Sequence, residues 1–508
     1  MKKGSITIYL AMTLTVFLSL FVTVIEGARN RAVCIQAQCG LDLAVYSVFA
    51  EYNRELLSQY DLFFIDTSYG EKEGSPKRLK RHLDAYITEN LSEGIFEHGN
   101  GTDLTKTFLE RTDLTKISYA TDAKGKVFER QAIGYMKHKY GISYLEDIKK
   151  ELKTVDEKEL LTKDISGPRE ENQSVIDEAK ENGIATGEVD ENGEEIRKEI
   201  SLDNPADTVN GNRSKGILAL VTKPDAVLSD AAVDMTAYVS HRKPGEKGNG
   251  LAGRDGISYG ESLFFDAYIL EKCGNYTAPK KEGVLWYQAE YILAGKNNDI
   301  DNLKTVVRRL LLLREVSNVT FLFSDASKVS EAAGLATSIC TAAGAPVLIE
   351  PVKITLLFAW AYAEAIYDTR CLLEGERIPL IKSQQSWHYS LQGMLSAGQD
   401  SLQSAPEGSM TQSVRTSRES EDGSALMHSG TLWEDGLSYS DYLRIFLATS
   451  SEQQKIDHMM DIVEMDVRKA SHHIGFCMDN CVDYICVEAC VGSKYGYSQE
   501  LEREFYYE

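Results

Sequence analysis

The chain has 508 residues, of which 43% are apolar, and its formal net charge is −22. The apolar fraction is ordinary for a globular protein, and the length is enough for two or three domain cores. The negative charge argues against nucleic acid and anionic membrane surfaces as partners.

An uninterrupted apolar segment lies near the amino end. Lys2 and Lys3 precede a run from Ile6 to Ile25 that contains no charged residue, and Arg29 and Arg31 follow it. A helix of about 20 residues spans roughly 30 Å, the thickness of a bilayer core. A cleaved signal peptide is the alternative, but its apolar core is shorter, about 7–15 residues. We therefore predict an uncleaved single-pass anchor in the cell membrane, held in the lipid bilayer, with the bulk of the chain extracytoplasmic.

Small and hydroxylated residues recur every four positions along this segment, at Thr7, Ala11, Thr15, Ser19, Thr23 and Gly27. Such residues let two membrane helices approach closely, and their hydroxyls can bond across the contact. The alternative is that the hydroxyls bond carbonyls of their own helix. A period of four drifts around a 3.6-residue helix, so only part of the stripe can face one partner. We predict helix packing at Thr15, Ser19, Thr23 and Gly27.

Two short motifs flank the apolar segment, Gly4-Ser5-Ile6-Thr7 before it and Glu26-Gly27-Ala28-Arg29 after it. This amino end resembles that of TadE/TadG-like proteins, the pseudopilin-like components of tight-adherence (Tad, Flp-type) pilus machinery. A group of uncharacterised Firmicutes proteins shares the amino end and is also similar to this chain over residues 36–66 and 291–296. The resemblance implies a component of a pilus or secretion assembly, with other membrane or pilus-assembly proteins as partners.

The same resemblance marks Gly4 as a possible processing site. Pilin-type precursors are cut after a glycine, and the fifth mature residue is usually glutamate. Cleavage after Gly4 would place Tyr9 at that position, without the carboxylate that pairs with a neighbouring subunit. The resemblance therefore implies a membrane-resident assembly or surface component rather than a major pilin.

The residues after the anchor predict a helix that leaves the membrane and continues into folded structure. Apolar spacing predicts one helix over 26–60, and the apolar run 62–65 predicts a buried strand. We assign 1–60 to the anchor and long helix, and 61–164 to a first extracytoplasmic α+β region. A membrane helix that runs into a soluble helix and then into strands is a pilin-like architecture, by analogy of fold alone.

An acidic stretch follows, with no aromatic residue between Tyr144 and Tyr238. We predict a charged helix over 146–163, because opposite charges fall at helical spacing. A segment that buries little apolar surface cannot offset its chain entropy, so we predict a disordered linker over 165–212. A calcium loop over 190–195 is the alternative, but it lacks the alternating ligand spacing.

The residues 213–394 form the predicted main α/β core. The patterns predict helices over 261–273, 302–316, 329–343 and 352–373, and strands over 216–221, 285–293 and 319–323. The apolar run 354–366 is too short for a second membrane span, so we expect a buried helix there.

The last segments are a Ser/Gly-rich loop over 395–430 and a carboxy-terminal helix and β-hairpin over 431–508. An amphipathic helix is expected over 438–473, and a strand over 482–491 that pairs with 495–507. The predicted fold class is α+β: a single amino-terminal transmembrane helix continues into a long soluble helix and then into mixed helix/strand extracytoplasmic domains.

Two patterns resemble chemical sites. Residues 248–253 match G-x-G-x-x-G, but no apolar strand precedes them, so we predict a plain glycine-rich loop. Four cysteines, with two histidines upstream, resemble a zinc site: His472, His473, Cys477, Cys481, Cys486 and Cys490. Zinc sites usually separate their cysteine pairs by a longer loop, so packed thiols or a disulfide are the favoured alternatives.

The sequence contains no HExxH motif, P-loop or Ser/His/Asp nucleophile motif. We therefore predict no catalytic residue, no cofactor and no metal, and a protein that is not an enzyme. Two alternatives to the assembly component use the same anchor. One is a surface binding or adhesion protein, and the other is a tethered extracytoplasmic enzyme, since catalytic acid pairs need no local motif.

Overall fold

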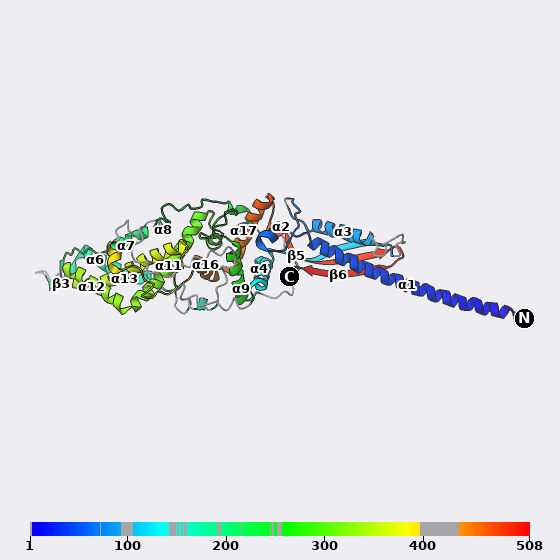
Figure 1. Ribbon diagram of the computed structural model, residues 1–508, viewed down its shortest axis with the longest axis horizontal. Coiled ribbons are helices and arrows are strands. Elements are labelled where there is room, and N and C mark those ends of the chain that lie inside the picture. The colour runs from blue at the N-terminus through cyan, green and yellow to red at the C-terminus, as the bar shows by residue number, and fades with distance from the viewer. Residues whose placement is uncertain are drawn as a thin grey trace. The chain divides into compact units, whose positions relative to one another are not determined.

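The structure is a computed structural model of the chain (Figure 1). It describes residues 3–71, 73–92, 105–141, 149, 152–153, 156, 160–189, 195–214, 216–243, 245, 248–250, 257–396 and 436–507. Contacts group these residues into two units whose segments alternate along the sequence. Unit 1 consists of Met1–Lys139, Met235–Phe265 and Ile456–Glu508, and unit 2 of Tyr140–Asp234 and Asp266–Lys455. The six segments predicted from the sequence run consecutively and do not anticipate this alternation.

Unit 1 is a sheet with helices on one face. Its strands are β1 (Ile65–Asp66), β2 (Thr107–Tyr119), β5 (Cys481–Ser493) and β6 (Ser498–Tyr506), and β5 pairs antiparallel with each of the others. Its helices include α1 (Lys3–Phe49), α2 (Arg54–Tyr60), α3 (Pro76–Ser92), α4 (Asp122–Tyr140, which ends in unit 2), η2 (Met235–Ala237) and η4 (Met478–Asn480). The boundary between the units falls within α9 (Tyr259–Lys272) and α17 (Glu452–Ser471).

The sequence of β5 explains which face of the sheet is covered. Apolar residues alternate with polar ones, and Ile485, Val487, Ala489 and Val491 all point into one buried cluster. The same cluster contains Ala37, Leu41, Ala44 and Val48 of α1 and Leu79, Leu83, Ile87 and Leu91 of α3. Figure 1 shows α1 and α3 against the sheet, with the amino-terminal half of α1 extending beyond it.

Unit 2 is mainly helical. Its core is α11 (Asp299–Ser324), α12 (Ala326–Ala342) and α13 (Ile349–Leu373), which pack on one another. Around them lie α6 (Ser166–Asn182), α7 (Ala206–Gly211), η1 (Asn212–Ser214), α8 (Ile217–Val221), α10 (Gln288–Ala294), η3 (Pro346–Leu348), α14 (Leu391–Ser396) and α16 (Tyr439–Ala448). A separate hairpin is formed by β3 (Ile184–Val189) and β4 (Glu195–Lys198). The helix α13 is largely buried, as predicted for the apolar run 354–366.

Several predicted elements have different boundaries. The helix expected over 26–60 ends at Phe49, and α2 starts after Asn53, whose side chain accepts hydrogen bonds from the backbone N–H groups of Glu55 and Leu56. Only Ile65 of the strand expected over 62–65 is in β1. The helix expected over 438–473 is two helices, because α16 ends at Ala448 and α17 begins at Glu452.

Three predicted strands are wrong. The segments 216–221, 285–293 and 319–323 hold α8, most of α10 and the last turns of α11. Short apolar runs have no periodicity that separates a strand from a buried helix, and in unit 2 these runs are buried among helices. The helices expected over 261–273, 302–316, 329–343 and 352–373 are confirmed as parts of α9, α11, α12 and α13.

The disordered linker predicted over 165–212 is also wrong as a structural description. The segment contains α6, the hairpin of β3 and β4, and α7. Ile176 and Ala179 are buried on α6, which packs against α13. A few apolar side chains at helical spacing are enough to dock a charged helix on a large apolar neighbour. The calcium-loop alternative, most of the charged helix at 146–163 and nearly all of the loop at 395–430 lie outside the described residues.

Candidate assembly surface

The first half of α1 presents apolar side chains on every side. From Ile6 to Ile25 the large apolar side chains are 55–71% exposed, and none of these positions carries a charge. The helix is long and apolar enough to cross a membrane, a property shared by anchors and by signal sequences. A soluble protein rarely exposes so large an apolar surface, so this half of α1 calls for lipid or another protein around it.

The predicted packing residues lie on this exposed half, but their hydroxyls already have acceptors. Thr15 donates to the carbonyl of Ala11 (2.5 Å), Ser19 to Val16 (2.8 Å) and Thr23 to Ser19 (2.8 Å). Gly27 has open space where a side chain would stand. These bonds match the alternative in which the hydroxyls bond their own helix. The small volume of the residues still allows close approach, so helix packing stays a prediction, as does processing at Gly4, which lies in the first turns of α1.

The junction between the two halves of α1 is fixed by the turn between β5 and β6. The Arg29 guanidinium lies 4.0 Å from the ring centre of Tyr495, and Tyr497 donates to the carbonyl of Glu26 (3.5 Å). The Gln499 amide donates to Asn30 (3.3 Å). The apolar half of α1 therefore has a defined direction relative to the sheet.

The glycine-rich segment serves packing against β2. The N–H of Gly250 donates to the carbonyl of Ile117 (2.9 Å), and Asn249 bonds Ile117 and Thr115. A Cβ on Gly248 would lie 2.3 Å from the Ile117 carbonyl oxygen, and one on Gly250 would lie 2.5 Å from the Tyr484 ring. The glycines at 248 and 250 therefore permit close contact with the edge of the sheet, while residues 251–256 lie outside the described part.

All nine cysteines are free thiols. Cys481 is fully buried, and Cys477 accepts from Arg468 at 3.4 Å. The thiols of Cys486 and Cys490 donate to Glu502 (3.3 Å) and Glu110 (3.1 Å) on the outer face of the sheet. Among the described residues, no close group of three or more metal-ligand side chains contains two of the four clustered cysteines. The packed-thiol interpretation therefore fits the geometry, and the zinc interpretation does not.

Two groups of potential metal ligands do form. One is Cys486, Glu502 and Glu504, but Glu504 is bound by Lys116 at 2.8 Å, and burial raises the pKa of the Cys486 thiol. The other is Glu364, Asp368 and His388 in unit 2. Lys382 places its ammonium between the two carboxylates, 2.7 Å from Glu364 and 2.6 Å from Asp368. A protein cation thus takes the place that a metal ion would need.

This charge network, which the sequence did not reveal, joins α11, α13 and the segment after α13. Arg314 binds Asp368 Oδ2 through two nitrogens (2.9 and 3.1 Å), and Asn318 adds a third donor (3.2 Å). Arg314, Asp368, Lys382 and Glu364 are all completely buried. Burial opposes ionisation of Asp368, but the two adjacent cations lower its pKa below the ordinary value. The network has the character of a structural brace rather than of a reactive site.

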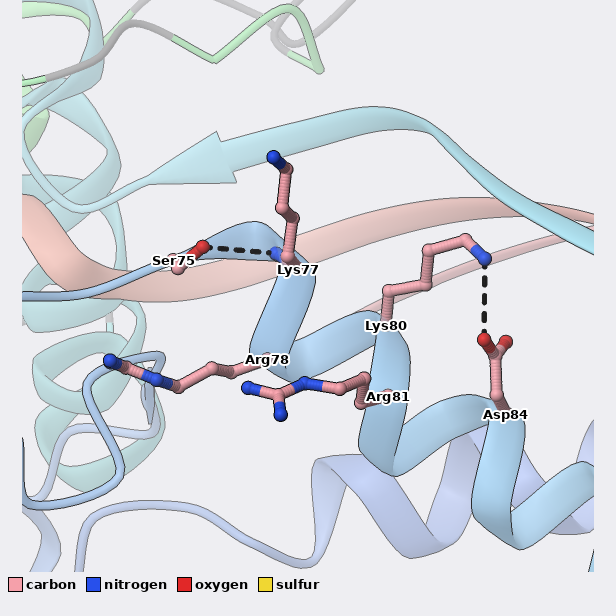
Figure 2. A pocket seen from close by; sticks show the side chains of 6 residues that line it. All are labelled: Ser75, Lys77, Arg78, Lys80, Arg81 and Asp84. Carbon is pink, nitrogen blue, oxygen red and sulfur yellow. Dashed lines mark hydrogen bonds and ion pairs between the residues drawn. The ribbon is translucent and has the colours of Figure 1, made fainter.

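A cationic pocket lies on α3. It has a volume of about 470 Å³ and is lined by Ser75, Lys77, Arg78, Lys80, Arg81 and Asp84 (Figure 2). Figure 2 shows Arg78 and Arg81 extending to the same side of the helix and Lys77 pointing away from them. Lys80 pairs with Asp84 at 3.2 Å, and Arg78 pairs with Glu71. The run Lys77-Arg78-Leu79-Lys80-Arg81 is the signal in the sequence that would have found this feature.

Comparison with known proteins adds a family and no function. No curated protein and no solved structure matches the chain. The model of a family of unknown function, DUF5702, matches residues 194–493, which is more than half of the chain and excludes α1. The chain belongs to the family DUF5702.

Proposed function

We propose that the protein is a non-enzymatic, membrane-anchored, extracytoplasmic component of a Tad-like pilus or secretion assembly. It acts through protein–protein and helix–helix contacts, with the amino-terminal half of α1 in the bilayer. The observation that carries the proposal is α1 itself. One continuous helix has an uncharged half of about 30 Å exposed on all sides and a second half buried against the sheet of unit 1.

The way in which α1 is held supports an anchor over a removable leader. Its second half supplies Ala37, Leu41, Ala44 and Val48 to the core of unit 1, and the junction contacts of Arg29 and Tyr497 fix its direction. Cleavage after the apolar run would leave the new terminus beside these contacts. If α1 stays intact, one helix lies in both the bilayer and unit 1, and it sets the orientation of unit 1 relative to the membrane.

Topology is the first test. Protease added to intact protoplasts should digest the chain from Arg29 onward and leave a small, membrane-protected amino-terminal fragment. Mass spectrometry of that fragment also reports whether Gly4 has been cut. Complete protection of the chain, or recovery of a soluble form without residues 6–25, would contradict the anchored topology.

Helix packing is the second test. Replacing Thr15, Ser19 and Thr23 with Leu keeps the segment apolar but fills the groove and pushes a partner helix away, at a cost of ~1–2 kcal/mol where the hydroxyls also bond across the contact. The matched control replaces Phe17, Phe21 and Val24 with Leu, which places three leucines on the opposite side of the helix. Crosslinking in the membrane should lose a partner in the first variant and keep it in the control. Identical crosslinks in both variants would contradict assembly through this stripe.

A further inference from the structure

The outer face of the sheet in unit 1 is strongly acidic. Register places Asp113 of β2 opposite Glu488 of β5, and Glu488 opposite Glu502 of β6, so three carboxylates form one row across three strands. Glu110, Glu500 and Glu504 lie on the same face, together with Arg111, which pairs with Asp113 at 3.4 Å, and Lys116, which pairs with Glu504 at 2.8 Å. Like charges directly opposite one another destabilise a sheet. The row is therefore a local cost that the fold of one copy does not need.

The first turns of α3 show the reverse arrangement. Lys77, Lys80 and Arg81 follow one another at helical spacing, where like charges repel. The first turn has no acidic residue, although the positive end of the helix dipole favours one. Among the described residues, Lys77 and Arg81 enter no ion pair, and both side chains are exposed. In a chain of net charge −22, this is a concentrated patch of positive charge.

The two patches lie on opposite sides of the same sheet. The apolar side chains of α3 belong to the cluster under the inner face, together with Ile485, Val487 and Val491 of β5. Residues of β5 alternate between the faces, so Glu488 and its cross-strand partners point outward. One copy therefore cannot bring its own basic patch to its own acidic row.

We propose that the acidic row of one copy binds the basic patch on α3 of a second copy. Patches of opposite charge on opposite faces define a head-to-tail contact, in which every copy offers one surface of each kind and chains or rings of copies result. Within one copy, Asp84 pairs with Lys80 and Arg111 pairs with Asp113, so each repulsion is offset only in part. The contact would supply the remaining opposite charge, which is the behaviour expected where local rules of stability are broken at a functional surface. The inference identifies a second copy as the partner in the proposed assembly. It rests on the proposed function in one respect, namely that all copies are anchored in the membrane in the same orientation.

Direct detection uses the full chain in membranes. Unlabelled and nitrogen-15-labelled copies are mixed in proteoliposomes and treated with a carbodiimide, which joins a carboxylate to a lysine amine in contact. Mass spectrometry should find peptides that join Lys77 or Lys80 of one isotope to Glu488, Glu500 or Glu502 of the other. Their absence, with other crosslinks between the two isotopes present, would overturn this contact while leaving the anchored-component proposal intact.

Charge reversal sharpens the test. One variant changes Lys77, Lys80 and Arg81 to Glu, and the other changes Glu488, Glu500 and Glu502 to Lys. Each alone should weaken self-association at least about tenfold, because like charges then meet. Mixing the two variants should restore association, since each surface again finds its opposite, and a chain with both changes should associate with itself.

The control variant carries the same change in net charge as the variant of Glu488, Glu500 and Glu502, but its substitutions lie in unit 2. Glu171, Glu178 and Glu181 are exposed on α6 of unit 2, and changing all three to Lys should leave self-association unaltered. Added salt should weaken the wild-type contact as it screens the charges. A monomeric wild type, or equal loss in the α6 control, or no restoration on mixing, would overturn the proposal.

Discussion

Two carboxylate clusters, one in each unit, are arranged in opposite ways. In unit 2, Glu364 and Asp368 are fully buried, and Lys382 lies between them, with Arg314 on the far side of Asp368. In unit 1, Asp113, Glu488 and Glu502 are exposed and lie opposite one another along the outer face of the sheet. In the buried cluster both carboxylates contact a cation, whereas in the exposed row, among the described residues, only Asp113 forms an ion pair, with Arg111 at 3.4 Å.

The difference separates charge that serves the fold from charge that is free for a partner. Removing an ionised carboxylate from water costs several kcal/mol, so a buried one stays ionised only with its cation and donors in place. An exposed carboxylate pays no such cost, and a row of them is tolerated by the fold at a small penalty. Substitutions in the two regions should therefore change stability by different amounts and with opposite signs.

The largest effect is expected at Lys382. Changing Lys382 to Met would leave Glu364 and Asp368 without the ammonium between them, and breaking a buried pair in this way costs about 3–5 kcal/mol. The tryptophans among the described residues, Trp286, Trp360 and Trp387, all lie in unit 2, so their fluorescence during urea unfolding reports on this unit. The midpoint should fall substantially at pH 7.

The control for Lys382 lies on the surface of α13. Lys353 pairs with Glu350 at 2.7 Å, and the Glu350 side chain is 66% exposed. Lys353→Met should change the free energy of unfolding by less than ~0.5 kcal/mol, since exposed pairs contribute little. Similar small losses in both variants would mean that the buried network does not brace unit 2.

A buried carboxylate without a cation should behave differently from the paired ones. Glu290 of α10 is fully buried and accepts from the Tyr439 hydroxyl and the Tyr276 N–H, each at 2.8 Å. Burial raises its pKa from 4.5 to about 7. Between pH 4.5 and about 7, Glu290 is therefore protonated in the folded state and ionised in the unfolded state. Its contribution to stability is full below pH 4.5 and is lost as the pH rises through about 7.

The substitution Glu290→Gln removes this titration and keeps an acceptor for both donors. The wild type should lose about 3 kcal/mol relative to the variant between pH 4.5 and pH 8, from the size of the pKa shift. Urea unfolding followed by tryptophan fluorescence at several pH values gives the difference directly. Parallel stability curves for the two proteins would show that the pKa of Glu290 is the same in the folded and unfolded states.

The contrast between the units also explains what the sequence could predict. The strand over 482–491 and its hairpin partner are confirmed as β5 and β6, because Ile485, Val487, Ala489 and Val491 recur at every second position on one buried face. The runs 216–221, 285–293 and 319–323 were misassigned because unit 2 buries its short apolar segments among helices. Short apolar runs do not separate a strand from a buried helix, whereas the longer helical patterns at 302–316, 329–343 and 352–373 were assigned correctly.

The two charge clusters could not be predicted from local sequence patterns. Arg314, Asp368 and Lys382 come from two helices and the segment after α13, and only the packing of α11 on α13 brings them together. The row of Asp113, Glu488 and Glu502 depends on the register of three strands, of which the sequence predicted only two. By contrast, the basic patch on α3 is a contiguous run, and the exposed half of α1 follows directly from composition.

The smallest effect, and the one of opposite sign, is expected in the acidic row. Glu488 faces a carboxylate on each neighbouring strand, so Glu488→Gln should stabilise the sheet by ~0.5 kcal/mol as two like-charge contacts disappear. Unit 1 contains no tryptophan, and hydrogen exchange of the β5 amides is the suitable measurement.

Glu504→Gln is the matched control, because Glu504 is bound by Lys116 and its loss should not slow exchange. Slower exchange in the first variant alone would show that the repulsion is real and is retained by the wild type at a cost. Unchanged or faster exchange in Glu488→Gln would mean that solvent already screens the row, and the contrast with the buried network would then be one of burial alone.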